Sequence, residues 1–184
     1  MNLDHQIFQL INQTLANSWF DSFFPVFTDL HKTIWFPYLL GVILLISFFR
    51  KWGRWAFYHL FVLILTVGIS DWIGAQVKDT FRRPRPFQNQ ELNAQQRSFA
   101  SENSSFYSNH SSNNFAAAYQ LTYFFPVAKY LFFVLAFLVG YSRIYNGVHY
   151  PSDVVCGALA GLFIAYLILK LSLVLKRKIQ GSEL

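Results

Sequence analysis

The chain has 184 residues, of which 54% are apolar, 20% are aromatic and only 13% are charged, and its formal net charge is +6 at pH 7. So few charged groups cannot cover the surface of a water-soluble domain of this length, so the composition indicates a protein embedded in lipid. The single cysteine, Cys156, excludes a disulfide framework and a cysteine-based metal site.

Residues 1–30 predict helices that do not span a membrane. Leucine and isoleucine recur every four residues with polar residues between them, at Leu3, Ile7, Ile11 and Leu15, and a run of aromatic residues follows at similar spacing. We expect one or two amphipathic helices in the membrane interface, and padding of the rim of a helix bundle is the alternative. The opening MNLDHQIFQL has no basic segment before an apolar core, so we expect no cleaved signal peptide.

Five apolar stretches follow, each close to the roughly 20 residues that a membrane-spanning helix needs. They cover residues 33–49, 55–77, 111–128, 126–145 and 154–175. The sequence therefore predicts an all-α fold, a polytopic membrane helix bundle of about five transmembrane helices in a single domain, with residues 31–178 as the helix bundle. Gly157 and Gly161 form a GxxxG pair in the last stretch, which suits close helix packing.

Basic residues near the ends of these stretches divide equally between the two faces of the membrane. Three of them, Lys78, Arg85 and Arg143, have a chemical role in the interpretation that follows. Setting these aside leaves an excess on the face that carries the RKWGR turn at residues 50–54. We therefore expect this turn and the carboxyl terminus in the cytoplasm, and the amino terminus and the polar loop at residues 87–107 outside.

Three polar clusters interrupt the apolar pattern, and all three fall on the same predicted face. They are KDTFRRPRP at residues 78–86, SNHSSNN at 108–114 and SRIYNGVHYPSD at 142–153. In the third cluster Pro151 suits the first turn of a helix, which places His149 and Asp153 four residues apart across that turn. A carboxylate on one imidazole nitrogen frees the other as a nucleophile or base, and the alternative role for Asp153 is to stabilise the helix dipole.

Cations in the same clusters favour a phosphate ligand. Lys78 offers a point charge, and Arg85 and Arg143 offer planar guanidinium groups that match a phosphate and the spread charge of its transition state. Anchoring of helix ends to lipid headgroups is the alternative, and we expect it of Arg82 or Arg83.

The second cluster adds neutral donors and a titratable group. Ser108 and the backbone N–H groups beside it lie at a predicted helix N-terminus, which favours anions. His110 in the same turn can protonate a departing alkoxide. If His110 is considered without the other clusters, a structural role is the expected one. His5, His31 and His59 have no such neighbours along the sequence, so we expect them to be structural.

The three clusters resemble the motifs of the type 2 phosphatidic-acid phosphatase superfamily, in its bacterial lipid phosphatase branch. The KxxxxxxRP motif is matched by Lys78, Arg85 and Pro86, and SRxxxxxHxxxD is matched by Ser142, Arg143, His149 and Asp153. The PSGH motif stands here as Tyr107, Ser108, Asn109 and His110, so two of its positions depart. Asn109 keeps the backbone N–H and tolerates the positive φ that a glycine position can require. Tyr107 is expected to alter the entrance of the pocket.

The resemblance implies a two-step mechanism without a metal or another cofactor. His149, held by Asp153, attacks phosphorus while His110 protonates the lipid oxygen, and a water activated by His110 then hydrolyses the phosphohistidine. The resemblance also implies that the phosphoryl oxygens are bound by Lys78, Arg85, Ser108, Arg143 and the N–H of Asn109, which together stabilise the transition state.

The partners implied are membrane lipids and a lipid phosphate, with an active site facing the outside of a bacterial inner membrane. Family substrates include phosphatidic acid, phosphatidylglycerol phosphate, undecaprenyl diphosphate and lipid A, and an outward site favours the last two. A phosphotransferase that passes the phosphate to another lipid is one alternative. A silent protein that only binds lipid phosphates is another, because of Tyr107 and Asn109. We expect no nucleic-acid partner, because the basic residues cap apolar runs and do not line one face.

Overall fold

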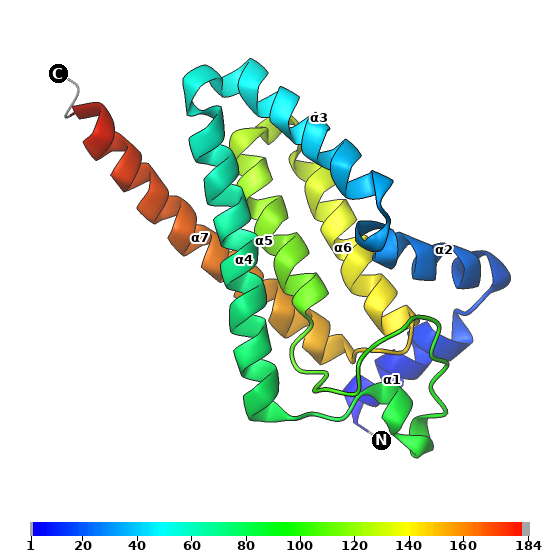
Figure 1. Ribbon diagram of the computed structural model, residues 1–184. Coiled ribbons are helices and arrows are strands. Elements are labelled where there is room, and N and C mark those ends of the chain that lie inside the picture. The colour runs from blue at the N-terminus through cyan, green and yellow to red at the C-terminus, as the bar shows by residue number, and fades with distance from the viewer. Residues whose placement is uncertain (1, 182–184) are drawn as a thin grey trace.

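The structure, a computed structural model, describes residues 2–181, and within that range it consists of helices and loops with no β-strand (Figure 1). The α-helices are α1 (Leu3–Gln9), α2 (Ser18–Asp29), α3 (Trp35–Trp52), α4 (Ala56–Phe81), α5 (Asn109–Phe124), α6 (Lys129–Tyr145) and α7 (Pro151–Gly181). A π-helical turn (Leu10–Thr14) continues α1, and 3-10 turns join several of the others. The predicted all-α class is confirmed.

Helix α5 lies at the centre of the bundle, in contact with α4, α6 and α7, while α3 packs on α4 (Figure 1). Length and composition identify three segments able to cross a membrane: Trp35–Gln88, which holds α3 and α4, Pro126–Tyr145 and Pro151–Gly181. Each of the five predicted stretches contains a helix, α3 to α7. Helix α5 is not among the segments that are long and apolar enough to cross a membrane. Its 16 residues begin with NHSSNN, and its neighbours shield that polar turn.

The third predicted stretch ran to residue 128, whereas α5 ends at Phe124. The apolar run continues through this point, so hydropathy gives no sign of the end. Pro126 has no backbone N–H and starts a separate 3-10 turn (Pro126–Ala128), which ends the helix.

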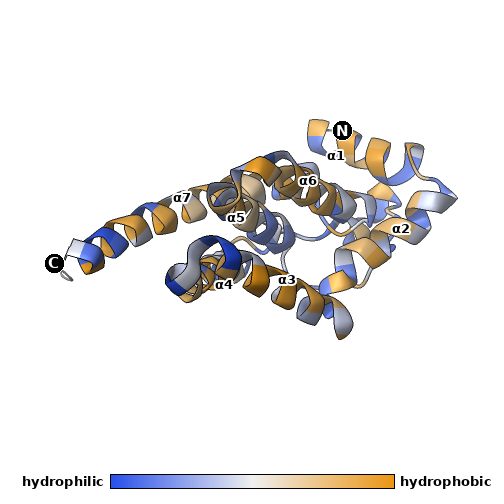
Figure 2. Ribbon diagram, turned by 90° about the horizontal axis from the view of Figure 1, so that it is seen from above, coloured by the Kyte–Doolittle hydropathy of each residue, from blue (hydrophilic) through white to orange (hydrophobic). Residues whose placement is uncertain are grey.

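The outer faces of the long helices remain apolar and exposed. Ile64 on α4 is 70% exposed, and Phe137 on α6 and Leu159 on α7 are each 61% exposed. Figure 2 shows apolar residues along the outside of α3, α6 and α7. Exposed apolar surface of this extent is unfavourable in water and suits contact with lipid tails. The structure therefore supports the integral-membrane class predicted from composition.

The GxxxG pair allows α7 to approach α5 closely. A Cβ atom at Gly157 would lie 2.5 Å from the Ser108 carbonyl oxygen, and one at Gly161 would collide with the Ser112 carbonyl oxygen. The absence of side chains at these two positions therefore fixes the distance between α7 and the first turns of α5.

Replacing Gly161 by alanine is expected to destabilise the protein, because a backbone carbonyl cannot move aside without displacing α5. Overpacking of this kind costs about 1–3 kcal/mol, which should appear as a lower thermal unfolding midpoint in detergent. The matched control is Gly41→Ala on α3, where a new Cβ meets nothing within 4 Å. Alanine is the better helix former, so the control should keep or raise the midpoint. Equal midpoints for the two variants would contradict this account of the α5–α7 contact.

The amino-terminal segment is helical as predicted, but it packs in an unexpected way. Phe8 is fully buried against Leu92 and Tyr150, in the loops that follow α4 and precede α7. Asn12, which the pattern assigns to the polar face, is fully buried and donates from Nδ2 to the carbonyl oxygens of Gln95 (2.9 Å) and Tyr145 (2.8 Å). The segment therefore covers the polar loops at this end of the bundle.

The three polar clusters meet at one end of the bundle. Helix α4 ends there, α5 begins there, and α6 is followed by a short turn into α7 (Figure 1). The 3-10 turn at residues 53–55 and the carboxyl end of α7 lie at the opposite end (Figure 1). The predicted co-location of the clusters is thus seen in the fold.

Candidate active site

A cavity of about 350 Å³ opens where the clusters meet. It is lined by Lys32, Ala75, Lys78, Asp79, Arg85, Phe99, Ala100, Ser101, Asn103, Asn109, His110, Arg143 and His149. Six of the residues proposed from the sequence line it, and the other two, Ser108 and Asp153, lie behind it. The lining contains four cationic side chains and one carboxylate, so the cavity favours an anion.

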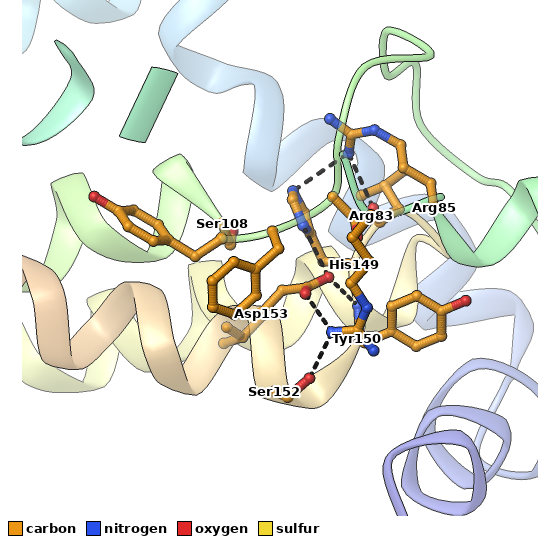
Figure 3. Close-up of polar contacts among 12 residues, drawn as sticks. Arg83, Arg85, Ser108, His149, Tyr150, Ser152 and Asp153 are labelled. Atoms are coloured by element: carbon orange, nitrogen blue, oxygen red, sulfur yellow. Dashed lines mark hydrogen bonds and ion pairs between the residues drawn. The ribbon is translucent and has the colours of Figure 1, made fainter. Parts of the chain in front are cut away.

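His149 lies in the short turn between α6 and α7, where it is 2% exposed. Its Nδ1 lies 3.5 Å from Oδ2 of Asp153, and its Nε2 lies 3.4 Å from Nη1 of Arg85 (Figure 3). A guanidinium group only donates, so this arrangement assigns a lone pair to Nε2 and the proton to Nδ1. The nitrogen beside Arg85 is therefore the one with a free lone pair.

The surroundings keep the His149 ring neutral. Burial lowers the pKa of His149 well below 6.5, and the charges of Arg85, Arg143 and Lys78 lower it further. The pKa is lowered because both desolvation and nearby cations disfavour the charged imidazolium form. A neutral imidazole is the form that can attack phosphorus.

The turn before α7 depends on a glycine. Gly147 has φ of +78°, and a Cβ there would collide with the carbonyl oxygen of Gln95. Glycine alone accepts this conformation at no steric cost, so the tight turn can bring His149 back over the start of α7.

Asp153 is fully buried in the first turn of α7. Its Oδ2 accepts a hydrogen bond from the Tyr150 N–H at 2.9 Å and faces His149, while its Oδ1 accepts from Nη1 of Arg83 at 2.6 Å. The geometry is compatible with both roles considered from the sequence, because the same carboxylate satisfies a backbone donor at the helix start and lies 3.5 Å from the imidazole.

Arg85 is held from several sides. Its Nη1 donates to the Val148 carbonyl oxygen at 3.0 Å, and its Nε and Nη2 donate to the backbone oxygen and the side chain of Asn103 at 3.1 and 2.8 Å. The side chain is only 4% exposed. A guanidinium fixed in this way is already oriented before a ligand binds, which reduces the entropy cost of binding.

Lys78 and Asn109 are joined directly. Lys78 Nζ donates to the Tyr107 carbonyl oxygen (2.6 Å) and to Asn109 Oδ1 (2.9 Å), while Asn109 Nδ2 donates to the side chain of Asp71 (3.0 Å). The asparagine side chain occupies space that a Cβ at Gly74 would fill. Asn109 therefore positions the lysine through its side chain, in addition to any contribution from its backbone N–H.

The two departures from the PSGH pattern differ in their effect on the cavity, since Asn109 lines it and Tyr107 does not. The only non-glycine residues with positive φ in residues 2–181 are Arg82 and Asn93, so Asn109 replaces glycine without backbone strain. Tyr107 is 5% exposed and does not line the cavity, so the expected change at the entrance is wrong. Ser108 caps α5, where its hydroxyl accepts from the Ser111 N–H at 3.4 Å.

His110 and Arg143 meet residues from the end of α2. His110 Nε2 is buried without a hydrogen-bond partner, and its ring centroid lies 5.4 Å from that of His31. Arg143 donates from Nη1 to Thr28 Oγ1 at 3.0 Å, while its Nε is buried and unpartnered. His31, for which the sequence predicted a structural role, therefore lies beside one of the candidate site residues. No local pattern reveals this contact, because it joins segments far apart in the chain.

Arg83 is also not the lipid anchor that the sequence suggested for Arg82 or Arg83. It is half-buried, forms ion pairs with Asp4 and Asp153 at 2.6 Å each, and lies 4.0 Å from the Tyr150 ring centroid (Figure 3). Arg82 instead donates to the Asp79 carbonyl oxygen near the surface. The missed signal is the position of Arg83 one residue after a helix end, where the chain turns toward α7.

One group in the described part of the chain has ligands that suit a divalent cation. Oxygen and nitrogen atoms of Asp29, His31 and His110 all lie within 4.8 Å of one another. Asp29 is already paired with Lys32 at 2.9 Å, and the cavity carries further cations. These positive charges disfavour binding of a cation at this place. The sequence pattern gave no sign of the group, because His110 is distant in sequence from Asp29 and His31.

Comparisons with known proteins identify a family and similar structures. The family model described as PAP2 superfamily matches residues 55–177. The chain is similar to the crystal structure of Aquifex aeolicus LpxE, with a TM-score of 0.73 and 30% identity over 92% of this chain and 96% of that one.

Two further proteins are similar over different extents. The first transmembrane PAP2 type phosphatidylglycerolphosphate phosphatase from Bacillus subtilis has a TM-score of 0.70 at 24% identity, covering 91% of this chain and 83% of that one, which shows a shared fold. The Bacitracin transport permease protein BcrC of Bacillus licheniformis is 46% identical over 61 residues, which are 33% of this chain and 30% of that protein.

Proposed function

Because this chain belongs to the PAP2 superfamily, and is thus a membrane phosphatase, we propose that it removes phosphate from a lipid through a phosphohistidine at His149. The observation that carries this proposal is the position of His149 Nε2. It lies beside buried Arg85, in a cavity that Lys78 and Arg143 also line. A neutral nitrogen nucleophile among fixed cations is what in-line attack on a phosphate requires.

The first step forms a nitrogen–phosphorus bond. His149 Nε2 attacks phosphorus, the bond from phosphorus to the lipid oxygen breaks, and His110 gives its proton to that oxygen. Asp153 stabilises the positive charge that develops on the His149 ring. Lys78, Arg85 and Arg143 offset the charge on the phosphoryl oxygens. Preorganised contacts of this kind make the largest single contribution to transition-state stabilisation in many enzymes.

The second step returns the enzyme to its starting state. His110, now neutral, takes a proton from a water molecule as that water attacks phosphorus, and the bond to His149 breaks. Inorganic phosphate leaves, and His110 holds the proton it needs for the next cycle. In this mechanism one histidine acts first as acid and then as base.

The substrate we propose is a lipid phosphomonoester or diphosphate: undecaprenyl diphosphate, lipid A, phosphatidylglycerol phosphate or phosphatidic acid. Purified protein in detergent should release inorganic phosphate from at least one of them, with water as the acceptor and with activity unchanged by EDTA. Colorimetric phosphate detection and mass spectrometry of the lipids measure both products. A lipid that gains phosphate would identify a phosphotransferase, and no product from any of the four would favour a silent binder.

Loss of activity in EDTA that a divalent cation restores would contradict the metal-free mechanism. The group of Asp29, His31 and His110 would then be the first place to look for the ion. Inhibition by vanadate gives a positive check on the nucleophile, because vanadate mimics the phosphate and bonds to a histidine nitrogen.

We also propose that the active site faces the outside of a bacterial inner membrane. Support comes from the excess of cations at the RKWGR turn, which lies at the opposite end of the bundle from the cavity (Figure 1). Labelling of single cysteines placed at Gln95 and at Gly53 tests this orientation. Reaction of position 53 with an impermeant reagent from outside would show that the orientation is the opposite one.

A further inference from the structure

Arg83 joins the buried carboxylate behind His149 to the first helix of the chain. Its Nη1 donates to Asp153 Oδ1 at 2.6 Å and to Ser152 Oγ at 2.7 Å, and its Nη2 donates to Asp4 Oδ2 at 2.6 Å (Figure 3). The planar guanidinium thus contacts two carboxylates from opposite ends of the sequence. Charge-assisted bonds of this length are among the stronger and more directional ones in proteins.

Asp4 makes further contacts with the start of α7. Its Oδ1 accepts from the Ser152 N–H at 2.8 Å and its Oδ2 accepts from Ser152 Oγ at 2.6 Å. The backbone N–H groups in the first turn of a helix have no partners inside the helix, and a carboxylate there is favourable. Asp4 therefore fixes the first turn of α7 from outside that helix, next to Asp153.

The guanidinium is itself held against movement. It stacks over the Tyr150 ring at 4.0 Å, and the Arg83 backbone is tied to the loop by a bond from its N–H to Ser104 Oγ at 2.9 Å and by one from the Ser105 N–H to its carbonyl oxygen at 2.8 Å. A side chain fixed at both its base and its tip can orient a partner. An arginine that only neutralised charge would need no such contacts.

Arg83 controls the carboxylate of Asp153 and does not reach the substrate. It is absent from the cavity lining, while Asp153 divides its oxygens between Arg83 on one side and the Tyr150 N–H and His149 on the other. Without Arg83, Oδ1 would lose its ion pair, and the carboxylate would be held only by the Tyr150 N–H and the Ser105 side chain. The orientation of Oδ2, which lies 3.5 Å from His149 Nδ1, would then be less well fixed.

We infer that Arg83 is a positioning residue for the His149–Asp153 pair and that Asp4, through Arg83 and Ser152, makes helix α1 part of the catalytic apparatus. The inference rests on the proposed function, since it requires His149 to be the nucleophile. It gives the amino-terminal helix a role in catalysis in addition to packing.

The test measures kcat and KM of purified Arg83→Gln on whichever lipid phosphate the parent hydrolyses. A misplacement of about 1 Å at a reacting group can cost roughly 100-fold, so we expect kcat to fall about 10- to 100-fold. KM should change less than about threefold, because Arg83 does not line the cavity. The matched control is Arg82→Gln, whose side chain contacts only the Asp79 carbonyl oxygen among the contacts described and should leave both constants near those of the parent.

A second variant covers the case in which Arg83→Gln does not fold. Asp4→Asn keeps the shape of the side chain but removes its charge, and kcat should fall about 3- to 10-fold by the same loss of orientation. In the double variant Asp4→Asn should add less than about twofold to the loss from Arg83→Gln, because the Arg83–Asp4 ion pair is already lost and only the bonds of Asp4 to Ser152 remain to be weakened.

Two results would overturn the inference. One is Arg83→Gln with kcat within twofold of the parent while His149→Ala is inactive. The other is a double variant whose loss equals the product of the two single losses. Activity that survives His149→Ala would instead reject the proposed function, so the two failures are distinguishable.

Discussion

Replacing His149 by alanine is expected to abolish phosphate release, with a loss in kcat on the order of 10⁴-fold or more, as for removal of other covalent nucleophiles. The remaining cations can bind the phosphate, but no group takes the place of Nε2. The fold should survive, because the contacts of the His149 ring with Arg85 and Asp153 are long, at 3.4 and 3.5 Å. Steady-state phosphate release and the thermal midpoint in detergent measure the two effects.

A matched control changes another buried histidine at the far end of the bundle. His59 lies 3.1 Å from Lys176 and packs on Trp52 and Phe124. Its replacement by glutamine should leave kcat within about twofold, because distant sites act independently. Activity of His149→Ala within tenfold of the parent would reject the phosphohistidine mechanism.

Replacing His110 by alanine is expected to reduce turnover of a lipid phosphate by about 10²- to 10⁴-fold, the usual range for a general acid and base. The alkoxide of a lipid is a poor leaving group and needs the proton. A substrate such as p-nitrophenyl phosphate needs it much less. The variant should therefore still form the phosphohistidine from p-nitrophenyl phosphate and then hydrolyse it slowly.

This difference gives a direct measurement. A rapid burst of about one p-nitrophenol per enzyme should precede slow turnover in His110→Ala, as expected when breakdown of a covalent intermediate limits the rate. Acid-labile phosphate should accumulate on the protein at the same time. The double variant His110→Ala, His149→Ala should show neither, which serves as the control. A single variant with neither a burst nor bound phosphate would exclude His110 as the group that breaks down the intermediate.

The three cationic residues of the cavity come from separate elements. Lys78 is near the end of α4, Arg85 is in the loop after it, and Arg143 is in the last turn of α6. Burying one such cation without a counter-ion is costly, and burying three together is more so. Arg143 Nε and His110 Nε2 are left without hydrogen-bond partners. Buried polar groups that stay unpaired are usual where a ligand completes them.

Local patterns were enough to predict that His149 and Asp153 meet in the turn between α6 and α7. The two residues are four positions apart around Pro151, and they lie 3.5 Å from each other in the structure. Hydropathy likewise located α3, α4, α6 and α7, since a helix in lipid must be apolar along its outer face. Counting the stretches between the polar clusters was enough to place all three clusters at the same end.

Other parts of the site depend on contacts that no local pattern encodes. Asp4 meets Ser152 across 148 positions of the sequence, and Thr28 meets Arg143 across 115. These contacts require α1 and α2 to fold back over the loops, which is decided by the burial of side chains such as Phe8. Hydropathy along residues 1–30 shows an amphipathic helix but does not show what its polar side will face.

The two adjacent arginines show the same limit most clearly. By composition Arg82 and Arg83 are equivalent, and the sequence alone assigned one or the other to the membrane surface without distinguishing them. In the structure Arg82 takes a left-handed conformation, with φ of 44°, that ends α4 and turns the chain, so Arg83 points to Asp153 and Asp4. The sequence by itself predicted the groups that we propose to react, because that prediction depends on residue type and short spacing. Only the tertiary structure decided which neighbours hold them, because that depends on how distant segments pack.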